Sequence, residues 1–253
     1  MTAMRIHVVN PNTTAAMTDK IAAAARTAAA AGTEILATTS AEGPVSIEGF
    51  FDGALSLPGL LAEIGHAERM KVDAHIIACF DDTGLDAARS LSAAPVIGIG
   101  EAAYHLATLV GGRFSVVTTL ARSVPVLEQN LMRYGLAFRC ASVRAAGVPV
   151  LALEKPNGPA RERISAEIAA ALADDRADAI VLGCSGMADL AASLSAEHGV
   201  PVIEGVAAAV KLAEALCGLN LRTSKAGGWA TPAPKHYAGH LAAFDGAGGD
   251  LRA

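Results

Sequence analysis

Two short segments of this chain resemble each other, and each ends in a cysteine. Residues 73–79 read DAHIIAC, and residues 178–184 read DAIVLGC. Each run is apolar and has the length of a buried strand, so each predicts a strand that carries a thiol at its carboxyl end. The pair constrains the fold, because it indicates two similar halves whose thiols can face each other across a cleft.

Three further pairs of segments recur in the same order. Residues 5–9, 34–38 and 95–97 match residues 113–117, 142–146 and 201–203, and all four offsets lie between 105 and 108 residues. Strings of Val, Ile and Ala are common, so one match alone carries little weight. Four matches in one order with nearly constant spacing indicate an internal duplication.

Short apolar strands alternate with Ala-rich helices along the chain, a pattern typical of an α/β protein with parallel sheets covered on both faces. At 253 residues the chain is long for one compact domain and sufficient for two small ones. No flexible linker separates the halves, so we expect them to pack tightly. The pattern weakens after residue 218, and residues from 247 onward are predicted to be disordered.

Composition excludes several classes of function. Aromatic residues make up only 4% of the chain, which argues against a stacking platform for nucleic acid, and the net charge of -5 offers no basic face for phosphates. No apolar run is long enough to cross a bilayer, and the start of the chain lacks the pattern of a signal peptide. We therefore expect a cytoplasmic protein, without a membrane or nucleic-acid partner, whose four cysteines stay reduced.

The sequence predicts neither a metal nor an organic cofactor. No C-x-x-C or H-E-x-x-H spacing occurs, and no G-x-G-x-x-G or P-loop follows a predicted strand. His7 and His75 fall inside strand patterns, where core residues are more common than catalytic bases.

Ligands of parallel sheets bind at the carboxyl ends of the strands, so the residues that follow the repeated strands are the site candidates. These are Asn10, Asn12, Ser46, Ile47, Cys79, Thr118, Thr119, Gly183, Cys184 and Ser185. Ile47, Phe80 and Tyr104 are expected to set the size of the pocket. Simpler roles stay open: the Asn and Thr residues can cap helices, and Ser46 can shape a turn.

Two opposed thiols suit a reaction in which a proton leaves one face of a carbon and another returns to the opposite face. Each thiol precedes an expected helix start, whose N–H groups would lower the pKa of the thiol. Asp81 and Asp82 follow Cys79 directly and oppose its ionisation. We therefore expect Cys184 to form a thiolate more easily than Cys79, whereas Cys140 and Cys217 are expected to be small buried residues.

The chain resembles the aspartate/glutamate racemase superfamily and, more closely, its hydantoin racemase family. The resemblance lies in VNPNT at residues 9–13, PVSIEG at 44–49, ACFDDTGL at 78–85, SVVTT at 115–119 and LGCSGM at 182–187. The segment around the first cysteine and the run around the second are specific in combination.

This resemblance implies two similar flavodoxin-like α/β domains with parallel sheets, related by a pseudo-two-fold axis, with the active site in the cleft between them. Residues 1–98 together with about 207–253 would form the first domain, and residues 99–206 the second. The implied protein is a homo-oligomer, with a tetramer favoured and a hexamer possible.

The implied reaction is the cofactor-independent racemisation of 5-monosubstituted hydantoins. Cys79 and Cys184 would be the acid/base pair, with the first serving the D-isomer and the second the L-isomer. The implied substrate-binding residues are Asn10, Asn12, Ser46, Ile47, Phe80, Thr118, Thr119, Gly183 and Ser185.

Other activities stay open. Allantoin is itself a 5-substituted hydantoin, but allantoin racemases tend to show Gly-Asp-Pro-Gly after the first cysteine, where this chain has DDTG at 81–84. The broader hydantoin substrate is therefore favoured over allantoin. Another isomerase of the superfamily, a one-thiol decarboxylase and a thiol sensor are further alternatives, although the matched pair of cysteines argues against the decarboxylase.

Overall fold

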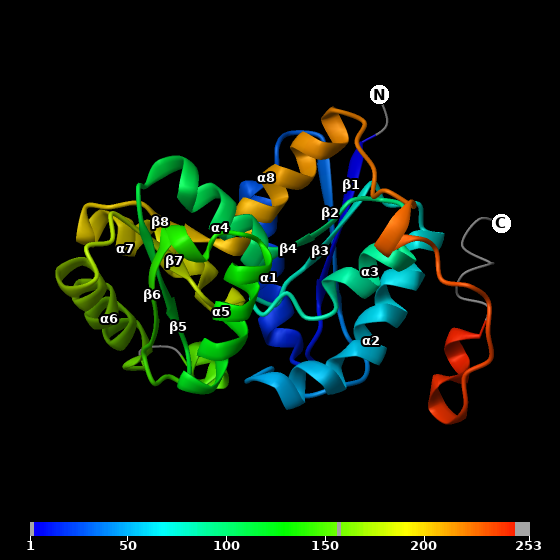
Figure 1. Ribbon diagram of the computed structural model, residues 1–253, viewed down its shortest axis with the longest axis horizontal. Coiled ribbons are helices and arrows are strands. Elements are labelled where there is room, and N and C mark those ends of the chain that lie inside the picture. Colours follow the sequence, from blue (N-terminus) through cyan, green and yellow to red (C-terminus); the bar gives the residue numbers. More distant parts are fainter. Residues whose placement is uncertain (1–2, 156–157, 246–253) are drawn as a thin grey trace.

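The computed structural model describes residues 3–155 and 158–245 (Figure 1). The first half alternates strands and helices as the sequence predicts. In chain order it contains β1 (Met4–Asn10), α1 (Ala15–Ala28), β2 (Thr33–Thr39), α2 (Phe50–Arg69), β3 (Ala74–Ile77), α3 (Leu85–Leu91), β4 (Val96–Gly98) and α4 (Ile99–Val110).

The second half repeats this order, with short 3-10 helices (η) added in its loops. It contains β5 (Phe114–Thr118), η1 (Ala121–Ser123), α5 (Val124–Arg133), η2 (Ala137–Arg139), β6 (Cys140–Ala145), η3 (Val150–Glu154), α6 (Ala160–Asp174), β7 (Ala179–Leu182), η4 (Ser185–Leu190), α7 (Ala191–His198), β8 (Val202–Glu204) and α8 (Gly205–Gly218).

Among the described residues the strands form two parallel four-stranded sheets, which confirms the predicted fold class. The first sheet has the order β2-β1-β3-β4, and the second has the matching order β6-β5-β7-β8. The registers of the central pairs also match: Val9 of β1 pairs with Ile77 of β3, and Val117 of β5 pairs with Leu182 of β7. Each cysteine of the repeated segments therefore follows its sheet at the equivalent position.

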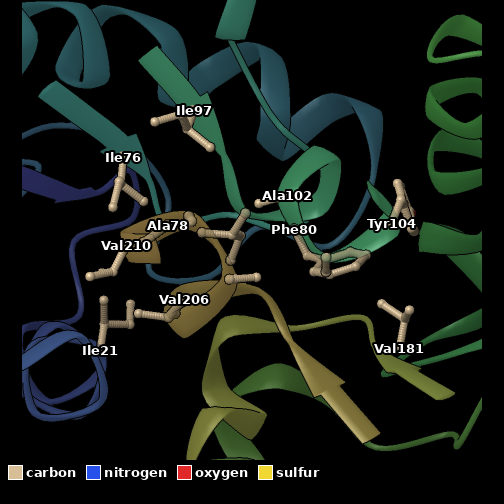
Figure 2. Packing of buried hydrophobic residues seen from close by; sticks show 14 of the residues in the cluster. Ile21, Ile76, Ala78, Phe80, Ile97, Ala102, Tyr104, Val181, Val206 and Val210 are labelled. Atoms are coloured by element: carbon tan, nitrogen blue, oxygen red, sulfur yellow. The ribbon is translucent and has the colours of Figure 1, made fainter. Parts of the chain in front are cut away.

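Helices α4 and α8 join the two halves. One hydrophobic cluster contains residues of both sheets and of both helices, so the core is continuous between the halves. Figure 2 shows Val206 and Val210 of α8 close to Ile21 of α1, to Ile76 of β3 and to Ala78, which follows β3. The many alanines of these helices leave room for close approach, and the tight packing expected from the absence of a linker is present.

After α8 the chain returns to the first half, where it lies beside α2 and α3 (Figure 1). The hydroxyl of Thr223 donates to the Ala94 carbonyl at 2.7 Å, and the Trp229 indole N–H donates to Asp86 at 3.1 Å. The boundaries at 98 and 207 stay a prediction, and the expected disorder from residue 247 lies outside the described residues. None of the described helices is both long and apolar enough to cross a bilayer.

Candidate active site

The two matched cysteines line one small cavity between the halves. Cys79 follows β3 and Cys184 follows β7, and both belong to the wall of a cavity of about 30 Å³. The other two cysteines lie elsewhere: the Cys140 thiol donates to the Ser142 carbonyl, and the Cys217 thiol donates to the Asp73 carbonyl. The placement of equivalent strands thus brings together two thiols that are 105 residues apart in the sequence.

Eight of the candidate residues line this cavity: Asn12, Ile47, Cys79, Phe80, Thr119, Gly183, Cys184 and Ser185. Five further lining residues were not candidates: Met17, Ala78, Asp81, Ser123 and Val150. Met17, Ser123 and Val150 come from the helices α1, η1 and η3, so no strand-end rule could find them. Ala78 and Asp81 are immediate neighbours of the candidates Cys79 and Phe80, so their positions in the sequence could have indicated that they line the cavity.

Asn10, Ser46 and Thr118 are candidates that do not line the cavity. The Asn10 amide donates to Asn12 Oδ1 at 3.0 Å, and the Thr118 hydroxyl donates to the Gly183 carbonyl at 2.9 Å. Asn10 and Thr118 are fully or almost fully buried, and each forms a hydrogen bond to a residue that lines the cavity. Tyr104, expected to shape the pocket, is fully buried and packs edge-to-face against Phe80.

Burial raises the pKa of both thiols, which corrects the expected lowering by helix N-termini. For Cys79 the pKa lies well above its ordinary value because of burial and of the nearby charge of Asp81. Burial raises the pKa of Cys184 to about 12, although the backbone N–H of Gly186 and the Lys20 ammonium favour its thiolate. Since the pKa of both thiols is raised, the expectation that Cys184 ionises more easily stays a prediction. Helix α3 begins only at Leu85, so Cys79 does not directly precede its N-terminus.

Lys20 of α1 reaches across to the half that carries Cys184. Its ammonium donates to the Leu153 carbonyl at 3.1 Å and to the Gly186 carbonyl at 3.5 Å, and it pairs with Glu154 at 3.2 Å. This cation is the attractive charge that acts on the Cys184 thiolate.

Asp82 is buried and serves the fold. Its carboxylate accepts the backbone N–H groups of Gly100 at 2.9 Å and Glu101 at 2.7 Å, at the start of α4. It also accepts the Tyr134 hydroxyl at 2.7 Å. At the equivalent start of α8, Glu204 caps its own helix through Val206 and Ala207. The start of α4 is thus capped by a carboxylate from the Cys79 loop, whereas the start of α8 is capped by the residue that directly precedes the helix.

Asp81 differs from Asp82, since it belongs to the wall of the cavity. The Asp81 carbonyl accepts the Asn130 side-chain amide at 2.7 Å. Its carboxyl group has no hydrogen-bond partner among residues 3–155 and 158–245. Burial raises the pKa of this carboxyl group to about 7. The cavity therefore contains two thiols and one carboxyl group that titrates near neutrality.

The cavity is narrow in this structure. A volume of about 30 Å³ holds about one water molecule. Ile47 of the first half and Val150 of the second form part of its wall. Glu48 joins these two segments, because its Oε1 atom accepts the Val150 backbone N–H at 3.0 Å. A hydantoin ring needs more space than this, so its binding requires the segments joined by such contacts to move apart.

The arrangement can hold a carbon acid between two proton-transferring sulfur atoms. A thiolate on one side removes a proton, and a thiol on the other side supplies one. The enclosing wall excludes bulk water, which strengthens hydrogen bonds to a developing negative charge.

The Asp/Glu/Hydantoin racemase family model matches residues 6–213. A hydantoin racemase of Rhizobium meliloti is 49% identical over 94% of this chain and 98% of its own length. An allantoin racemase structure from Klebsiella pneumoniae superposes with a TM-score of 0.94 at 49% identity, covering 96% of this chain and 99% of that chain. An allantoin racemase structure from Pseudomonas fluorescens gives a TM-score of 0.90 at 44% identity, covering 93% and 100%.

Proposed function

We propose that this chain, which belongs to the Asp/Glu/Hydantoin racemase family, interconverts the enantiomers of 5-monosubstituted hydantoins. The observation that carries the proposal is the shared cavity of Cys79 and Cys184 at equivalent strand ends. The similarity to curated hydantoin racemases supports the same substrate class.

In the proposed reaction one cysteine is a thiolate and the other a thiol. The thiolate removes the proton at C5 of the ring, and the electron pair spreads onto the neighbouring carbonyl oxygen as an enolate. The second thiol then gives its proton to the opposite face of C5 and becomes the thiolate. We assign the D-isomer to Cys79 and the L-isomer to Cys184, and no metal or organic cofactor takes part.

Allantoin is the second candidate substrate, favoured by the similarity to two allantoin racemase structures. Allantoin has the same ring and the same acidic C5 position, so the two-thiol reaction applies to it without change. Only the substituent on C5 separates the two candidates.

Polarimetry over a panel of substrates tests the function. One enantiomer each of an alkyl hydantoin, benzylhydantoin, allantoin and glutamate is incubated with the enzyme without added cofactor. We expect the optical rotation of the hydantoins to decay to zero and that of glutamate to persist. A protein that turns over allantoin but no other hydantoin has the narrower function.

Serine variants test the two-thiol reaction. Cys79→Ser and Cys184→Ser are each expected to lose racemisation by about 10²–10⁴-fold. In deuterated water each variant should still exchange the C5 proton of the enantiomer that its remaining thiol serves. Cys140→Ser and Cys217→Ser are matched controls, since neither residue lines the cavity. Full activity in Cys79→Ser or Cys184→Ser would contradict the proposal.

We also propose that the protein acts in the cytoplasm as a homo-oligomer. All four cysteines are free thiols, as a reducing compartment requires.

The proposed self-association rests on exposed apolar side chains. Leu109, Met132 and Phe138 are strongly exposed. Hydrogen bonds from Arg139 to the Thr108 and Gly111 carbonyls hold the Phe138 loop against the end of α4. Large exposed apolar side chains support self-association, which sedimentation velocity measures.

A further inference from the structure

The two thiol loops are equivalent in backbone position but not in their side chains. The backbone N–H two residues after each cysteine favours the thiolate, and these residues are Asp81 and Gly186. A Cβ atom on Gly186 would lie 2.9 Å from the Leu153 side chain, so the second loop has no space for a larger residue. Asp81 therefore places a single carboxyl group on one side of the cavity.

The backbone of Asp81 is held by hydrogen bonds, whereas its carboxyl group forms none with the described residues. Asn130 of α5 holds its carbonyl at 2.7 Å, and the next residue, Asp82, is anchored at the start of α4. Asp81 belongs to the wall of the cavity together with both cysteines. A polar group in this position is available to a substrate and is not needed to hold the loop.

We propose that Asp81, in its protonated form, donates a hydrogen bond to the carbonyl oxygen on which negative charge develops when a thiolate removes the C5 proton. This role rests on the proposed racemase function. The Asp81 proton is not consumed: it stays on the carboxyl group while one thiolate accepts the C5 proton and the other thiol donates its own.

The ionisation of Asp81 is coupled to that of the two thiols. Cys79 precedes it on the same loop, Cys184 lines the same cavity from the second half, and Asp82, which follows it, directs its carboxyl group to the start of α4. Asp81 raises the pKa of both thiols by charge repulsion, and by reciprocity a thiolate raises the pKa of Asp81. Tyr104 is also close enough for the charge of Asp81 to raise the pKa of its hydroxyl.

One net negative charge is therefore favoured in this small, water-poor cavity. When that charge is a thiolate, the carboxyl group is neutral and can donate, as an acid must in order to stabilise an enolate oxygen. The pKa of Asp81 is about 7 and that of Cys184 is about 12, so Asp81 loses its proton first. The reactive pair of thiolate and protonated carboxyl group then forms when a thiol passes its proton to Asp81 within this singly charged state. Activity should therefore rise as the pH passes the ionisation of Asp81.

Three variants separate this role from a structural one. Asp81→Asn keeps a hydrogen-bond donor but cannot ionise, Asp81→Ala has no donor, and Asp19→Asn removes an exposed charge from α1 as the matched control. We expect Asp81→Ala to lower kcat by about 10²–10³-fold, the cost of removing one donor to an oxyanion. Asp81→Asn should keep a large part of kcat and lose the rise of the wild-type pH profile near pH 7.

A second measurement needs no turnover. The rate of alkylation of Cys79 and Cys184 by iodoacetamide, resolved by peptide mass spectrometry across pH, reports the thiolate fraction. Asp81→Asn should increase both rates by about tenfold, equivalent to about one pKa unit, and Asp19→Asn should change neither. Unchanged alkylation together with an unchanged rise of activity near pH 7 in Asp81→Asn overturns the role of Asp81. Increased alkylation in a protein that racemises no hydantoin would instead reject the proposed function.

Discussion

Gly205 lies directly against the backbone of Ile99, where helices α8 and α4 begin. A Cβ atom on Gly205 would fall 2.5 Å from the Ile99 carbonyl oxygen and 2.8 Å from the Ile99 side chain. These two residues occupy equivalent positions of the duplicated sequence, so the contact lies near the axis that relates the halves. Any side chain on Gly205 must push the two halves apart.

Gly205→Ala is therefore expected to destabilise the protein by about 1–3 kcal/mol, because the atom it meets is rigid backbone. Gly65→Ala in α2 is the matched control: its Cβ meets no atom within 4 Å, so the higher helix propensity of Ala should stabilise the protein by about 0.5–1 kcal/mol. Urea unfolding of both variants measures the free energy of unfolding. Equal effects would show that the α4–α8 contact is loose in solution.

The fold could be predicted from the sequence because strand patterns and their order are local features that the duplication shows twice. The matched sheets follow from residues such as Val9 and Val117, which lie in the first strand of each repeat, and that strand is an inner strand of its sheet. The starts of helices were less predictable. The expected helix start beside Cys79 is a turn, because Asp82 is used to cap α4.

The site could be predicted only where it depends on strand ends. Cys79, Cys184 and Thr119 line the cavity. Asn10 and Thr118 are the last residues of β1 and β5, and they do not line the cavity but hydrogen-bond to residues that do. Val150 and Met17 could not be predicted, because their positions depend on how loops and helices pack between the halves. From the sequence, Asp81 is predicted only to oppose ionisation of the neighbouring thiol. Its place in the wall of the cavity could not be predicted, because that depends on how the loop folds.

The Lys20 ammonium is expected to set the reactivity of Cys184. Lys20→Met removes the attractive charge, so the pKa of Cys184 rises and its alkylation slows, by about tenfold for a pKa change of one unit. Cys79 should keep its rate. Lys20→Arg retains the charge and serves as the control. Alkylation of Cys184 at the wild-type rate in Lys20→Met would show that the cation does not act on the thiol.

A buried histidine pair makes stability depend on pH. His7 Nδ1 lies 3.0 Å from His75 Nδ1, and His75 Nε2 lies 2.8 Å from Glu68. Burial and the neighbouring His75 lower the pKa of His7 to about 3. Unfolded His7 binds a proton below about pH 6.5, while folded His7 does not, so its contribution to stability is lost as the pH falls from about 6.5 toward 3.

His7→Gln isolates this contribution, which has a limiting slope of about 1.4 kcal/mol per pH unit. The destabilisation caused by His7→Gln should be largest near pH 7 and shrink toward pH 4. The pKa values of Asp81 and Asp82 are raised to about 7, so these groups favour the folded state as the pH falls and mask the effect in wild type. The difference between variant and wild type removes that background. His105→Gln, at an exposed site, should give a pH-independent difference.

Opening of the cavity is expected to be limited by the bond between Glu48 and Val150. Glu48 is itself positioned by its backbone N–H, which donates to Asp52 at 3.0 Å. Glu48→Ala removes the acceptor for the Val150 N–H, and a hydrogen bond of about 1 kcal/mol corresponds to about fivefold more frequent opening. Both Cys79 and Cys184 should then be alkylated faster by about that factor, because reagent reaches them through the same cavity.

Glu48→Gln keeps an acceptor oxygen and should alkylate at a rate close to that of wild type. The kinetic consequence follows from what closure does: a site that opens easily admits substrate but holds it less well, so Glu48→Ala should raise KM more than it lowers kcat. An effect confined to one cysteine would contradict this, since a change in the pKa of a single thiol leaves the other rate unaltered. Equal acceleration of both thiols identifies opening of the shared cavity as the step that Glu48 controls.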